Sequence, residues 1–377
     1  MQPDKIRIGV LGGGQLGRMM IQNAINLNLP ICCLDPDPNA PCKHIATEFS
    51  VGSLNDFDTV YAFGQDKDVI TIEIENVNVA ALKKLQSEGK KVFPQPEVIE
   101  LIQDKGLQKL FYKEHAIPSP DFFLVNNKSE IAQHAASFPF FQKMRKGGYD
   151  GKGVVKLKNP DQLEHAFDAP SVLESLVDFD KEISVIVARN ESGAISCFPS
   201  VECAFNPEAN LVEFLFSPAN ISKKIEAEAE AIAVRVATEL NIVGILAVEM
   251  FVTKDGKVLV NEIAPRPHNS GHHSIEGNIT SQFEQHIRAI INLPLGKTSI
   301  INPAVMINLL GEKGYEGAAR YEGLEDALAQ AGVYVHLYGK AITKPFRKMG
   351  HITVVDKDLS LATEKAKALK ESIKIIS

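Results

Sequence analysis

Two strand-like runs around Asp255 and Gly256 constrain the fold of this 377-residue chain more than any other feature. The runs cover residues 247–253 and 257–263 and are rich in β-branched and apolar side chains, which favour strands. An Asp-Gly pair between such runs is typical of a two-residue type I′ turn, whose central positions both need positive φ. With this loop, Glu249 lies directly opposite Glu262. We therefore predict an antiparallel hairpin that pairs two carboxylates.

The predicted pairing of Glu249 with Glu262 points to a metal site. Directly opposed residues have Cβ atoms roughly 4.5–5.5 Å apart, so two carboxylates repel each other there unless a proton or a cation lies between them. Hard oxygen ligands favour Mg²⁺, with Mn²⁺ as an alternative, and leave coordination positions for nucleotide phosphates. Asn261 is a further oxygen donor if the strand bulges, since regular pleating turns it to the other face. The alternative is that both glutamates simply face solvent.

The N-terminal segment predicts a parallel α/β sheet. Residues 6–11 have the pattern of a buried strand, 15–27 of a helix and 30–34 of a second strand, and this alternation continues to about residue 100. The glycines at 12, 14 and 17 match the dinucleotide fingerprint, and Asp35 lies where a ribose-binding acid is expected. An NAD-dependent oxidoreductase is therefore one interpretation, and a tight turn without a ligand is another.

The rest of the chain mixes strands and helices in an α+β pattern. Strand-like runs flank a glycine run at residues 147–153, which places those glycines in a hairpin loop rather than before a helix. A long helix is predicted over residues 223–240, ahead of the carboxylate hairpin. After residue 302, a smaller segment of strands ends in an amphipathic helix at 361–373.

Composition narrows the classes of partner. The chain has 40 Lys and Arg against 47 Asp and Glu, a net charge of −7 with no block of one sign, so we expect neither nucleic acid nor an anionic membrane as partner. Its five cysteines lack C-x-x-C spacing, as expected of reduced thiols. No apolar run approaches the roughly 20 residues of a membrane span, and no signal region opens the chain. We expect a cytoplasmic protein that acts on small molecules.

A dense polar loop follows the hairpin. Between residues 265 and 273, two prolines and a glycine interrupt six side chains that form or orient hydrogen bonds, which are Arg266, His268, Asn269, Ser270, His272 and His273. A guanidinium binds carboxylate or phosphate through parallel hydrogen bonds, and amides and imidazoles orient a substrate. The histidines lack a helical spacing that would direct two rings at one zinc ion, and no cysteine joins them. We predict a substrate-binding loop.

These motifs, in this order, resemble the 5-(carboxyamino)imidazole ribonucleotide synthases of the ATP-grasp superfamily. The resemblance covers nearly the whole chain. Its main elements are the glycine run at 147–153, Glu249 with Asn261-Glu262, and the loop at 264–272, and it extends through residues 12–18, 73–77, 281–284, 306–308, Lys340 and 347–351.

The resemblance implies an ATP-grasp fold, α/β and α+β in class, in which ATP lies between two lobes. It divides the chain into a Rossmann-like pre-ATP-grasp domain at residues 1–103, a small lobe with a glycine-rich lid at 104–177, a large lobe with the metal site at 178–300, and a small β-rich C-terminal domain at 301–377 that packs on the large lobe.

The resemblance also implies the chemistry. In this family, ATP phosphorylates bicarbonate to carboxyphosphate, whose carboxyl group passes to the exocyclic amine of aminoimidazole ribonucleotide in purine biosynthesis. The implied partners are Mg²⁺ with ATP, bicarbonate, the ribonucleotide, a second copy of the chain in a homodimer, and the mutase that acts on the product. The closest alternative is another ATP-grasp ligase that acts on a different phosphorylated amine or a formyl donor.

Site residues follow from the resemblance in overlapping groups. The nucleotide group is Lys105, Lys143, Gly148, Tyr149, Asp150, Gly151, Lys152, Gly153, Glu174, Ser175, Leu176, Val177, Glu182, Phe205, Asn261 and Glu262. The ribonucleotide group is Gln15, Leu16, Glu75, Tyr149, Asp150, Lys152, Arg266, His268, Asn269, Ser270, Lys340 and Arg347, the last two for its phosphate. The metal ligands are Glu249, Glu262 and Asn261. The catalytic residues are Asp150, Lys152, Arg266 and His268. Lys152 would neutralise the moving charge, while Asp150 and His268 would manage the proton of the amine.

One position departs from the family pattern. Where related chains have a histidine near the nucleotide, this chain reads Cys203-Ala204-Phe205, so an apolar ring replaces an imidazole. Val154 also replaces a common glutamine after the lid. We expect weaker or differently oriented ATP binding rather than lost activity, because the metal and phosphate ligands remain.

Overall fold

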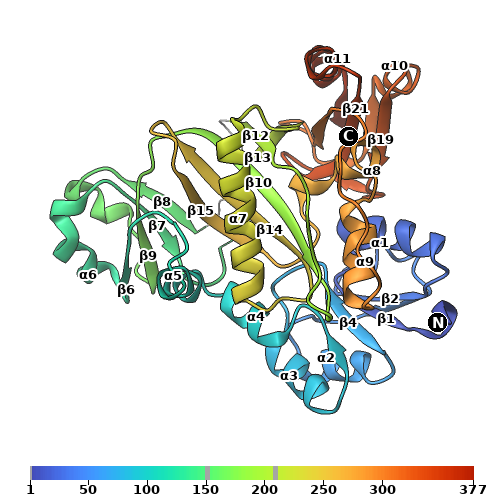
Figure 1. Ribbon diagram of the computed structural model, residues 1–377, viewed down its shortest axis with the longest axis horizontal. Helices are drawn as coiled ribbons and strands as arrows, with labels where there is room; N and C mark the ends of the chain where they lie inside the picture. Colours follow the sequence, from blue (N-terminus) through green and yellow to red (C-terminus); the bar gives the residue numbers. More distant parts are fainter. Residues whose placement is uncertain (1, 149–152, 207–210) are drawn as a thin grey trace.

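The computed structural model describes residues 2–148, 153–206 and 211–377. Its N-terminal part is a parallel sheet in the order β3-β2-β1-β4-β5 (Figure 1). The βαβ unit predicted from the sequence is confirmed by β1, α1 and β2. The strands are β1 (Ile8–Leu11), β2 (Ile31–Asp35), β3 (Glu48–Val51), β4 (Val69–Ile72) and β5 (Lys91–Val92), and the helices are α1 (Gln15–Asn26), α2 (Phe57–Gly64), α3 (Val79–Ser87) and α4 (Pro96–Ile102).

A small antiparallel sheet, β6-β9-β7-β8, forms a lobe at one end of the molecule (Figure 1). Strands β7 and β8, which flank the glycine run, pair in antiparallel register, as predicted for a hairpin. Asp104 caps α5 through two backbone N–H groups and pairs with Arg145 just after β7, which ties this helix to the lobe. The elements are α5 (Lys105–Glu114), β6 (Phe122–Val125), α6 (Lys128–Ile131), β7 (Phe140–Met144), β8 (Val154–Leu157) and β9 (Ser171–Ser175).

The central sheet joins the middle of the chain to its C-terminal part. Its strands follow the order β15-β14-β10-β12-β13-β16-β21-β19, and β11 pairs with β10. Because β13 pairs with β16, this sheet continues across residue 300, and the four-part division of the chain stays a prediction. The strands are β10 (Phe179–Arg189), β11 (Ile195–Cys197), β12 (Val201–Asn206), β13 (Leu211–Ser217), β14 (Gly244–Thr253), β15 (Val258–Ala264), β16 (Ala304–Leu310), β19 (Val333–Leu337) and β21 (Lys348–Val355).

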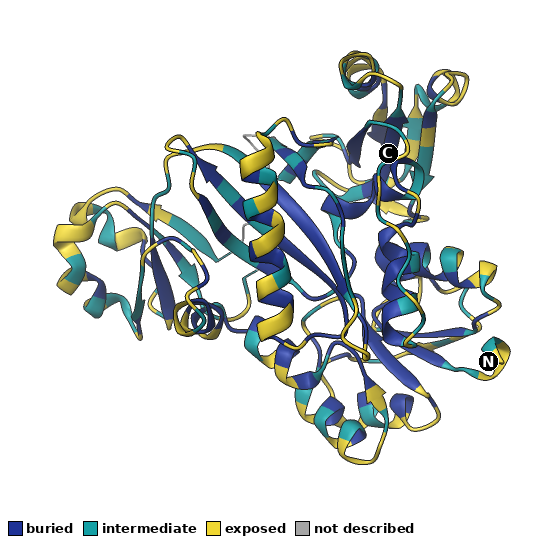
Figure 2. Cartoon of the chain, viewed as in Figure 1, coloured by how far each residue is buried: buried dark blue, intermediate teal, exposed yellow. Residues whose placement is uncertain are grey.

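Helices bury their apolar faces against this sheet (Figure 2). The long helix predicted over 223–240 is α7 (Lys223–Glu239), capped by Ser222, and its buried residues recur at helical spacing from Ile225 to Ala237. Helix α9 (Gln282–Ile290) packs between β14 and α1, and α11 (Leu359–Ser372) packs on β16 and β21. The remaining elements are α8 (Ser274–Gly277), β17 (Gly317–Ala318), β18 (Arg320–Glu322), α10 (Leu324–Leu328), β20 (Ile342–Thr343) and β22 (Lys374–Ile376).

The carboxylate hairpin has the predicted pairing but not the predicted turn. Glu249 lies opposite Glu262, whereas Met250 lies opposite Val260, so Asn261 is the extra residue of a β-bulge. The loop is one residue longer than predicted, because the Thr253 N–H donates to the Lys257 carbonyl and only Gly256 of the predicted turn pair has positive φ. The expected type I′ turn is therefore wrong. The longer loop and the bulge offset each other, which restores the opposition of the two glutamates.

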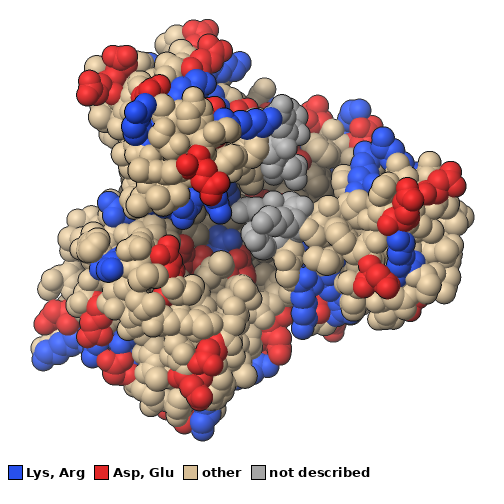
Figure 3. Space-filling model, turned by 180° about the vertical axis from the view of Figure 1, so that it is seen from behind, with Lys and Arg blue, Asp and Glu red and all other residues tan. Residues whose placement is uncertain are grey.

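The surface carries both signs of charge. Figure 3 shows acidic and basic side chains interspersed over one face of the molecule. No helix within the described residues is both long and apolar enough to cross a lipid bilayer.

Candidate active site

The two hairpin glutamates lie side by side at one face of the central sheet. Glu249 pairs with Glu262 on β15 and with Ser184 on β10. Burial, together with the Glu262 carboxylate, raises the pKa of Glu249 well above its usual range. The Lys105 ammonium, 2.9 Å from Glu262 Oε2, lowers the pKa of Glu262. Glu249 is therefore a half-buried carboxyl, and its neighbour Glu262 is neutralised by a lysine. A divalent cation between the two would balance their negative charge, so these residues fit Mg²⁺.

The bulge brings Asn261 into the same site. Asn261 and Glu262 line one cavity although they are adjacent in β15, which resolves the conflict between pleating and a shared ligand set. In the described ranges no cluster of three His, Cys, Asp or Glu side chains is arranged to hold an ion. Two carboxylates and an amide oxygen, completed by phosphate oxygens and water, form a ligand set that suits Mg²⁺.

Three lysines surround the carboxylates. Lys105 and Lys109 lie on α5 and Lys143 lies on β7. Lys143 Nζ is 2.8 Å from Glu174 Oε1 and 3.1 Å from Asn261 Oδ1, and Lys109 Nζ is 2.5 Å from Glu174 Oε2. Ammonium groups beside a carboxylate pair have the chemistry that binds a polyphosphate with its metal ion. Its walls are Lys105, Gln108, Lys109, Tyr112, Lys143, Val172, Glu174, Asn261 and Glu262.

Lys109 is a member of this cavity that the sequence analysis missed. Its side chain is 5% exposed, and burial lowers its pKa while the Glu174 carboxylate opposes that shift. Glu174 is equally buried and is shared between Lys109 and Lys143. The available signal was the four-residue spacing from Lys105, which puts both lysines on one face of α5.

Replacing Lys109 with Met is expected to destabilise the protein by about 2 kcal/mol, because the buried Glu174 keeps only one of its two cations. Thermal unfolding measures the effect. The exposed Lys113 on the same helix provides the control, and Lys113→Met should leave the midpoint unchanged. A double variant with Glu174→Leu removes both charges and should recover much of the loss. Equal stability of Lys109→Met and the control would contradict the importance of this ion pair.

Other residues of the predicted nucleotide group lie on β9, β10 and β12 and between β9 and β10. The Glu174 carboxylate is held by two lysines. Ser175, Leu176 and Val177, which follow it in the chain, are half-buried. Burial raises the pKa of Glu182, on β10, to about 7. Phe205, on β12, packs against the apolar cluster of Val201, Cys203, Val212, Leu215 and Met306.

The glycine-rich lid is described only at its ends. Gly147 and Gly153 have φ of 79° and 74°, a left-handed conformation that glycine adopts without strain. The Gly153 carbonyl accepts a hydrogen bond of 2.8 Å from the Met144 N–H, and Gly148 lies against Gly153. The other predicted lid residues, Tyr149, Asp150, Gly151 and Lys152, lie outside the described residues.

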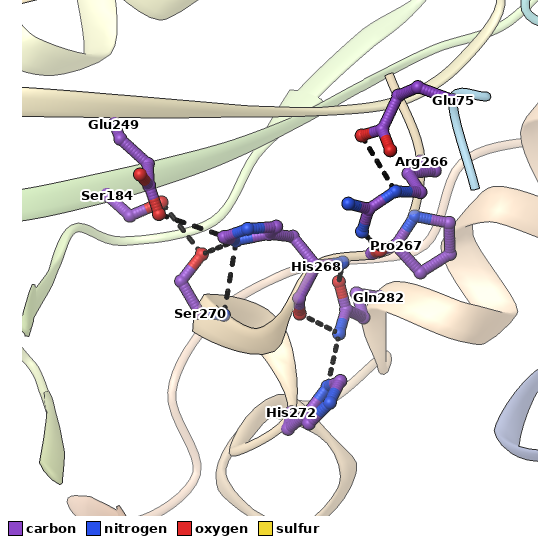
Figure 4. A network of polar contacts seen from close by, with 9 residues as sticks. All are labelled: Glu75, Ser184, Glu249, Arg266, Pro267, His268, Ser270, His272 and Gln282. Carbon is purple, nitrogen blue, oxygen red and sulfur yellow. Dashed lines mark hydrogen bonds and ion pairs between the residues drawn. The ribbon is translucent and has the colours of Figure 1, made fainter. Parts of the chain in front are cut away.

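The polar loop after β15 brings predicted substrate residues together (Figure 4). Arg266 Nε lies 2.8 Å from Glu75 Oε1, which joins the loop to the N-terminal domain. The Gln282 amide accepts from the His268 N–H at 2.9 Å and donates to its carbonyl at 2.7 Å. Ser270 Oγ lies 2.9 Å from His268 Nδ1, and burial lowers the pKa of His268 to about 3. The loop therefore presents a guanidinium and a neutral imidazole.

Three further predicted substrate residues differ in placement. Both amide atoms of Asn269 are shielded from solvent and lack a hydrogen-bond partner among the described residues, as expected of a side chain that meets a ligand. Lys340 Nζ donates to the Lys348 carbonyl at 2.7 Å, and Arg347 Nη1 donates to the Ile342 carbonyl at 2.7 Å. These contacts do not reach the Arg266 loop, so binding of a substrate phosphate by Lys340 and Arg347 stays a prediction.

The glycine turn before α1 is occupied by the protein's own carboxylates. The Gly13 N–H donates to Asp35 Oδ2 at 2.6 Å, and the Gly14 N–H donates to Glu73. Burial raises the pKa of Glu73 to about 7. Since the amides that would bind a pyrophosphate already have partners, the turn does not fit a dinucleotide. Gln15 begins α1, while the Leu16 side chain belongs to the domain core.

Comparison with known proteins identifies the family to which this chain belongs. Three family models match successive parts of the chain. They describe a ribonucleotide synthetase preATP-grasp domain at residues 5–103, an ATP-grasp domain at 110–283 and a phosphoribosylaminoimidazole carboxylase C-terminal domain at 304–365. The predicted fold class is confirmed.

Curated relatives agree along most of the chain. The chain is 40% identical over 354 residues to N5-carboxyaminoimidazole ribonucleotide synthase of Bacillus subtilis, a match that covers 92% of this chain and 90% of the relative. It is 39% identical over 365 residues to chloroplastic phosphoribosylaminoimidazole carboxylase of Vigna aconitifolia. That match covers 94% of this chain and 65% of the longer relative.

Solved structures extend the similarity to three dimensions. N5-carboxyaminoimidazole ribonucleotide synthetase from Thermotoga maritima has a TM-score of 0.91 at 46% identity over 99% of both chains. N5-carboxyaminoimidazole synthase from Aspergillus clavatus, in complex with ADP and 5-aminoimidazole ribonucleotide, has a TM-score of 0.89 at 32% identity over 98% of both chains. With its domain models, relatives and fold in agreement, the chain belongs to the N5-carboxyaminoimidazole ribonucleotide synthase family of ATP-grasp proteins.

Proposed function

We propose that this chain carboxylates the exocyclic amine of 5-aminoimidazole ribonucleotide with bicarbonate and ATP, and releases ADP and phosphate in purine biosynthesis. The observation that carries the proposal is that the carboxylate hairpin lies between the lysine cavity and the substrate loop. The carboxylate and lysine cavity suits a metal-bound polyphosphate, and His268 of the substrate loop lies with Nδ1 3.7 Å from Oε1 of Glu249, the strand partner of the cavity residue Glu262. A phosphoryl donor and an acceptor can therefore meet there.

The reaction balances as two transfers. A bicarbonate oxygen attacks the γ-phosphorus of ATP, the bond to the bridging oxygen breaks, and ADP leaves with that electron pair. The ribonucleotide amine then attacks the carbonyl carbon of carboxyphosphate, the carbon–oxygen bond to phosphate breaks, and the amine loses a proton. Water must be excluded throughout, because it would hydrolyse carboxyphosphate.

Residues of the cavity stabilise the phosphates. Lys105 and Lys143 supply ammonium groups to the phosphate oxygens, and Lys105 exchanges the Glu262 carboxylate for phosphate when nucleotide binds. Glu249, Glu262 and Asn261 would hold Mg²⁺, with Mn²⁺ as an alternative. The ion, when bound, neutralises charge on the phosphate oxygens. Glu174 and Lys109 keep Lys143 in place.

Residues of the loop hold the acceptor side. The Arg266 guanidinium, oriented by Glu75, binds a carboxylate or phosphate group of the reactants. Asn269 and Ser270 offer further polar groups, Lys340 and Arg347 bind the phosphate of the ribonucleotide, and Gln15 with Leu16 borders it. The lid residues from Gly148 to Gly153 close over the phosphates, where Lys152 neutralises charge, Tyr149 contacts the ribonucleotide and Asp150 accepts the amine proton.

ATP also contacts residues outside the lysine cavity. Glu174 to Val177 line the adenine, Glu182 binds the ribose, and Phe205 weakens or reorients nucleotide binding. We place the protein in the cytoplasm as a homodimer whose product passes to the mutase that acts next. The four-part division at residues 103, 177 and 300 belongs to the same set of predictions.

Phosphate release tests the function directly. The protein is incubated with ATP, Mg²⁺ and bicarbonate, with and without 5-aminoimidazole ribonucleotide, and the carboxylated product is identified by mass spectrometry. Release stimulated by the ribonucleotide, with one carboxylated product per phosphate, is the expected result. Bicarbonate-dependent turnover at the same rate with and without the ribonucleotide would instead indicate that another phosphorylated amine is the acceptor.

A further inference from the structure

His268 is held by two serine hydroxyls that connect it to the central sheet. Ser184 lies on β10 beside Glu249 and is 1% exposed. Its Oγ lies 2.8 Å from Ser270 Oγ, which lies 2.9 Å from His268 Nδ1 (Figure 4). We call Ser184 and Ser270 the serine relay. Within the described residues, the hydrogen bond of the Ser184 hydroxyl is the one with Ser270.

The backbone decides the direction in which the relay donates. The Ser270 N–H also points at His268 Nδ1, at 3.4 Å, because the imidazole caps the short 3₁₀ turn Asn269–Gly271. An N–H can only donate, so Nδ1 accepts and carries no proton. The Ser270 hydroxyl consequently donates to Nδ1 and the Ser184 hydroxyl donates to Ser270 Oγ. Hydrogen bonds aligned in this way reinforce one another.

An imidazole with an unprotonated Nδ1 is a neutral ring with its proton on Nε2. The His268 side chain is 19% exposed, and its Nε2 forms no hydrogen bond with any part of the chain that the structure describes. This N–H is therefore available to a ligand. When an amine attacks carboxyphosphate, negative charge develops on the carboxyl oxygens, and a positioned N–H donor stabilises it.

We propose that Ser184 is a positioning residue that acts through Ser270 to hold His268 as an Nε2–H donor for the carboxyl group being transferred. The catalytic part rests on the proposed function. A ring held in this form donates a hydrogen bond and does not take up the amine proton. This assignment narrows the role predicted for His268 from the sequence.

The tautomer is measured first, in the full chain without substrates. With ¹⁵N-labelled histidine and His268→Gln to assign the signals, ¹⁵N NMR should show a protonated Nε2 and an unprotonated Nδ1 for His268. A protonated Nδ1 overturns the proposal. Because no substrate is present, this measurement does not depend on the carboxylation activity.

Variants then test the contribution of Ser184. Ser184→Ala should shift the His268 tautomer ratio and lower kcat by about 10-fold while KM for ATP stays unchanged, because the Ser270 hydroxyl loses the partner that directs its proton at the ring and no nucleotide contact changes. Ser184→Thr keeps the hydroxyl and should retain most of the activity. Ser200→Ala is the matched control, since Ser200 is 0% exposed and its Oγ has no hydrogen-bond partner within the described residues.

The outcomes separate the two proposals. A wild-type tautomer ratio and a wild-type kcat in Ser184→Ala would overturn the role of Ser184, and so would an equal loss in Ser200→Ala. If the tautomer is as expected but the ribonucleotide stimulates no turnover in the wild type, the proposed function and the catalytic use of His268 fall, while the positioning by the relay stands.

Discussion

Glu262→Gln is expected to reduce ribonucleotide-stimulated phosphate release by on the order of 1,000-fold, a barrier increase of about 4 kcal/mol. The substitution keeps the shape of the side chain but removes the charge that would hold Mg²⁺ against the phosphates. It also removes the partner of Lys105, whose Nζ lies 2.9 Å from Glu262 Oε2. The assay measures initial rates over a range of Mg²⁺ concentrations, and the variant should need more Mg²⁺ for half-maximal rate.

Two further variants separate the metal from the lysine. Glu249→Gln leaves the Lys105–Glu262 ion pair intact, so a raised Mg²⁺ requirement in this variant reports on the carboxylate pair itself. Asp255→Asn changes a carboxylate on the same hairpin whose side chain is 59% exposed and should behave as wild type. An unchanged Mg²⁺ dependence in both Glu249→Gln and Glu262→Gln would contradict a role of the hairpin in holding the metal.

Arg266→Ala is expected to lower kcat/KM for the ribonucleotide by on the order of 100-fold. The guanidinium belongs to the substrate loop and contacts the N-terminal domain, since its Nε lies 2.8 Å from Glu75 Oε1. Loss of this group removes a donor from the acceptor side, whereas the lysine cavity remains, so KM for ATP should change little. Arg266→Lys should recover only part of the activity, because an ammonium cannot reproduce the planar fork of a guanidinium.

A double-mutant cycle with Glu75→Gln tests how Arg266 is oriented. Because the two side chains are in contact, their effects on kcat/KM should be less than additive. Arg288→Ala is the control, since Arg288 forms a comparable ion pair with Glu284 on α9 outside the substrate loop. Strictly additive effects of the Arg266 and Glu75 variants would show that Glu75 does not position Arg266, and a KM change confined to ATP would move Arg266 to the nucleotide side.

Local patterns were enough for much of the fold. The helices α1 and α7 begin at the predicted residues, because apolar periodicity and caps are properties of neighbouring residues. The turn at Asp255 shows the limit of such reasoning. The Asp-Gly pair predicted a two-residue loop, yet the hydrogen bonds of Thr253 with Lys257 set a longer one. The bulge at Asn261 offsets the extra loop residue and so restores the pairing of Glu249 with Glu262.

The pairing of Glu249 with Glu262, the polar loop after it and the family could all be inferred from the order of the residues. The partners of those side chains depend on how distant parts of the chain pack. Lys105 lies 157 residues from Glu262 in the chain, Ser184 lies 86 from Ser270, and Glu73 lies 59 from the Gly14 amide that it occupies. A glycine turn has the same local pattern whether a phosphate or a carboxylate fills it. Contacts across such separations depend on the packing of whole sheets, which leaves no periodic trace in the residues between them.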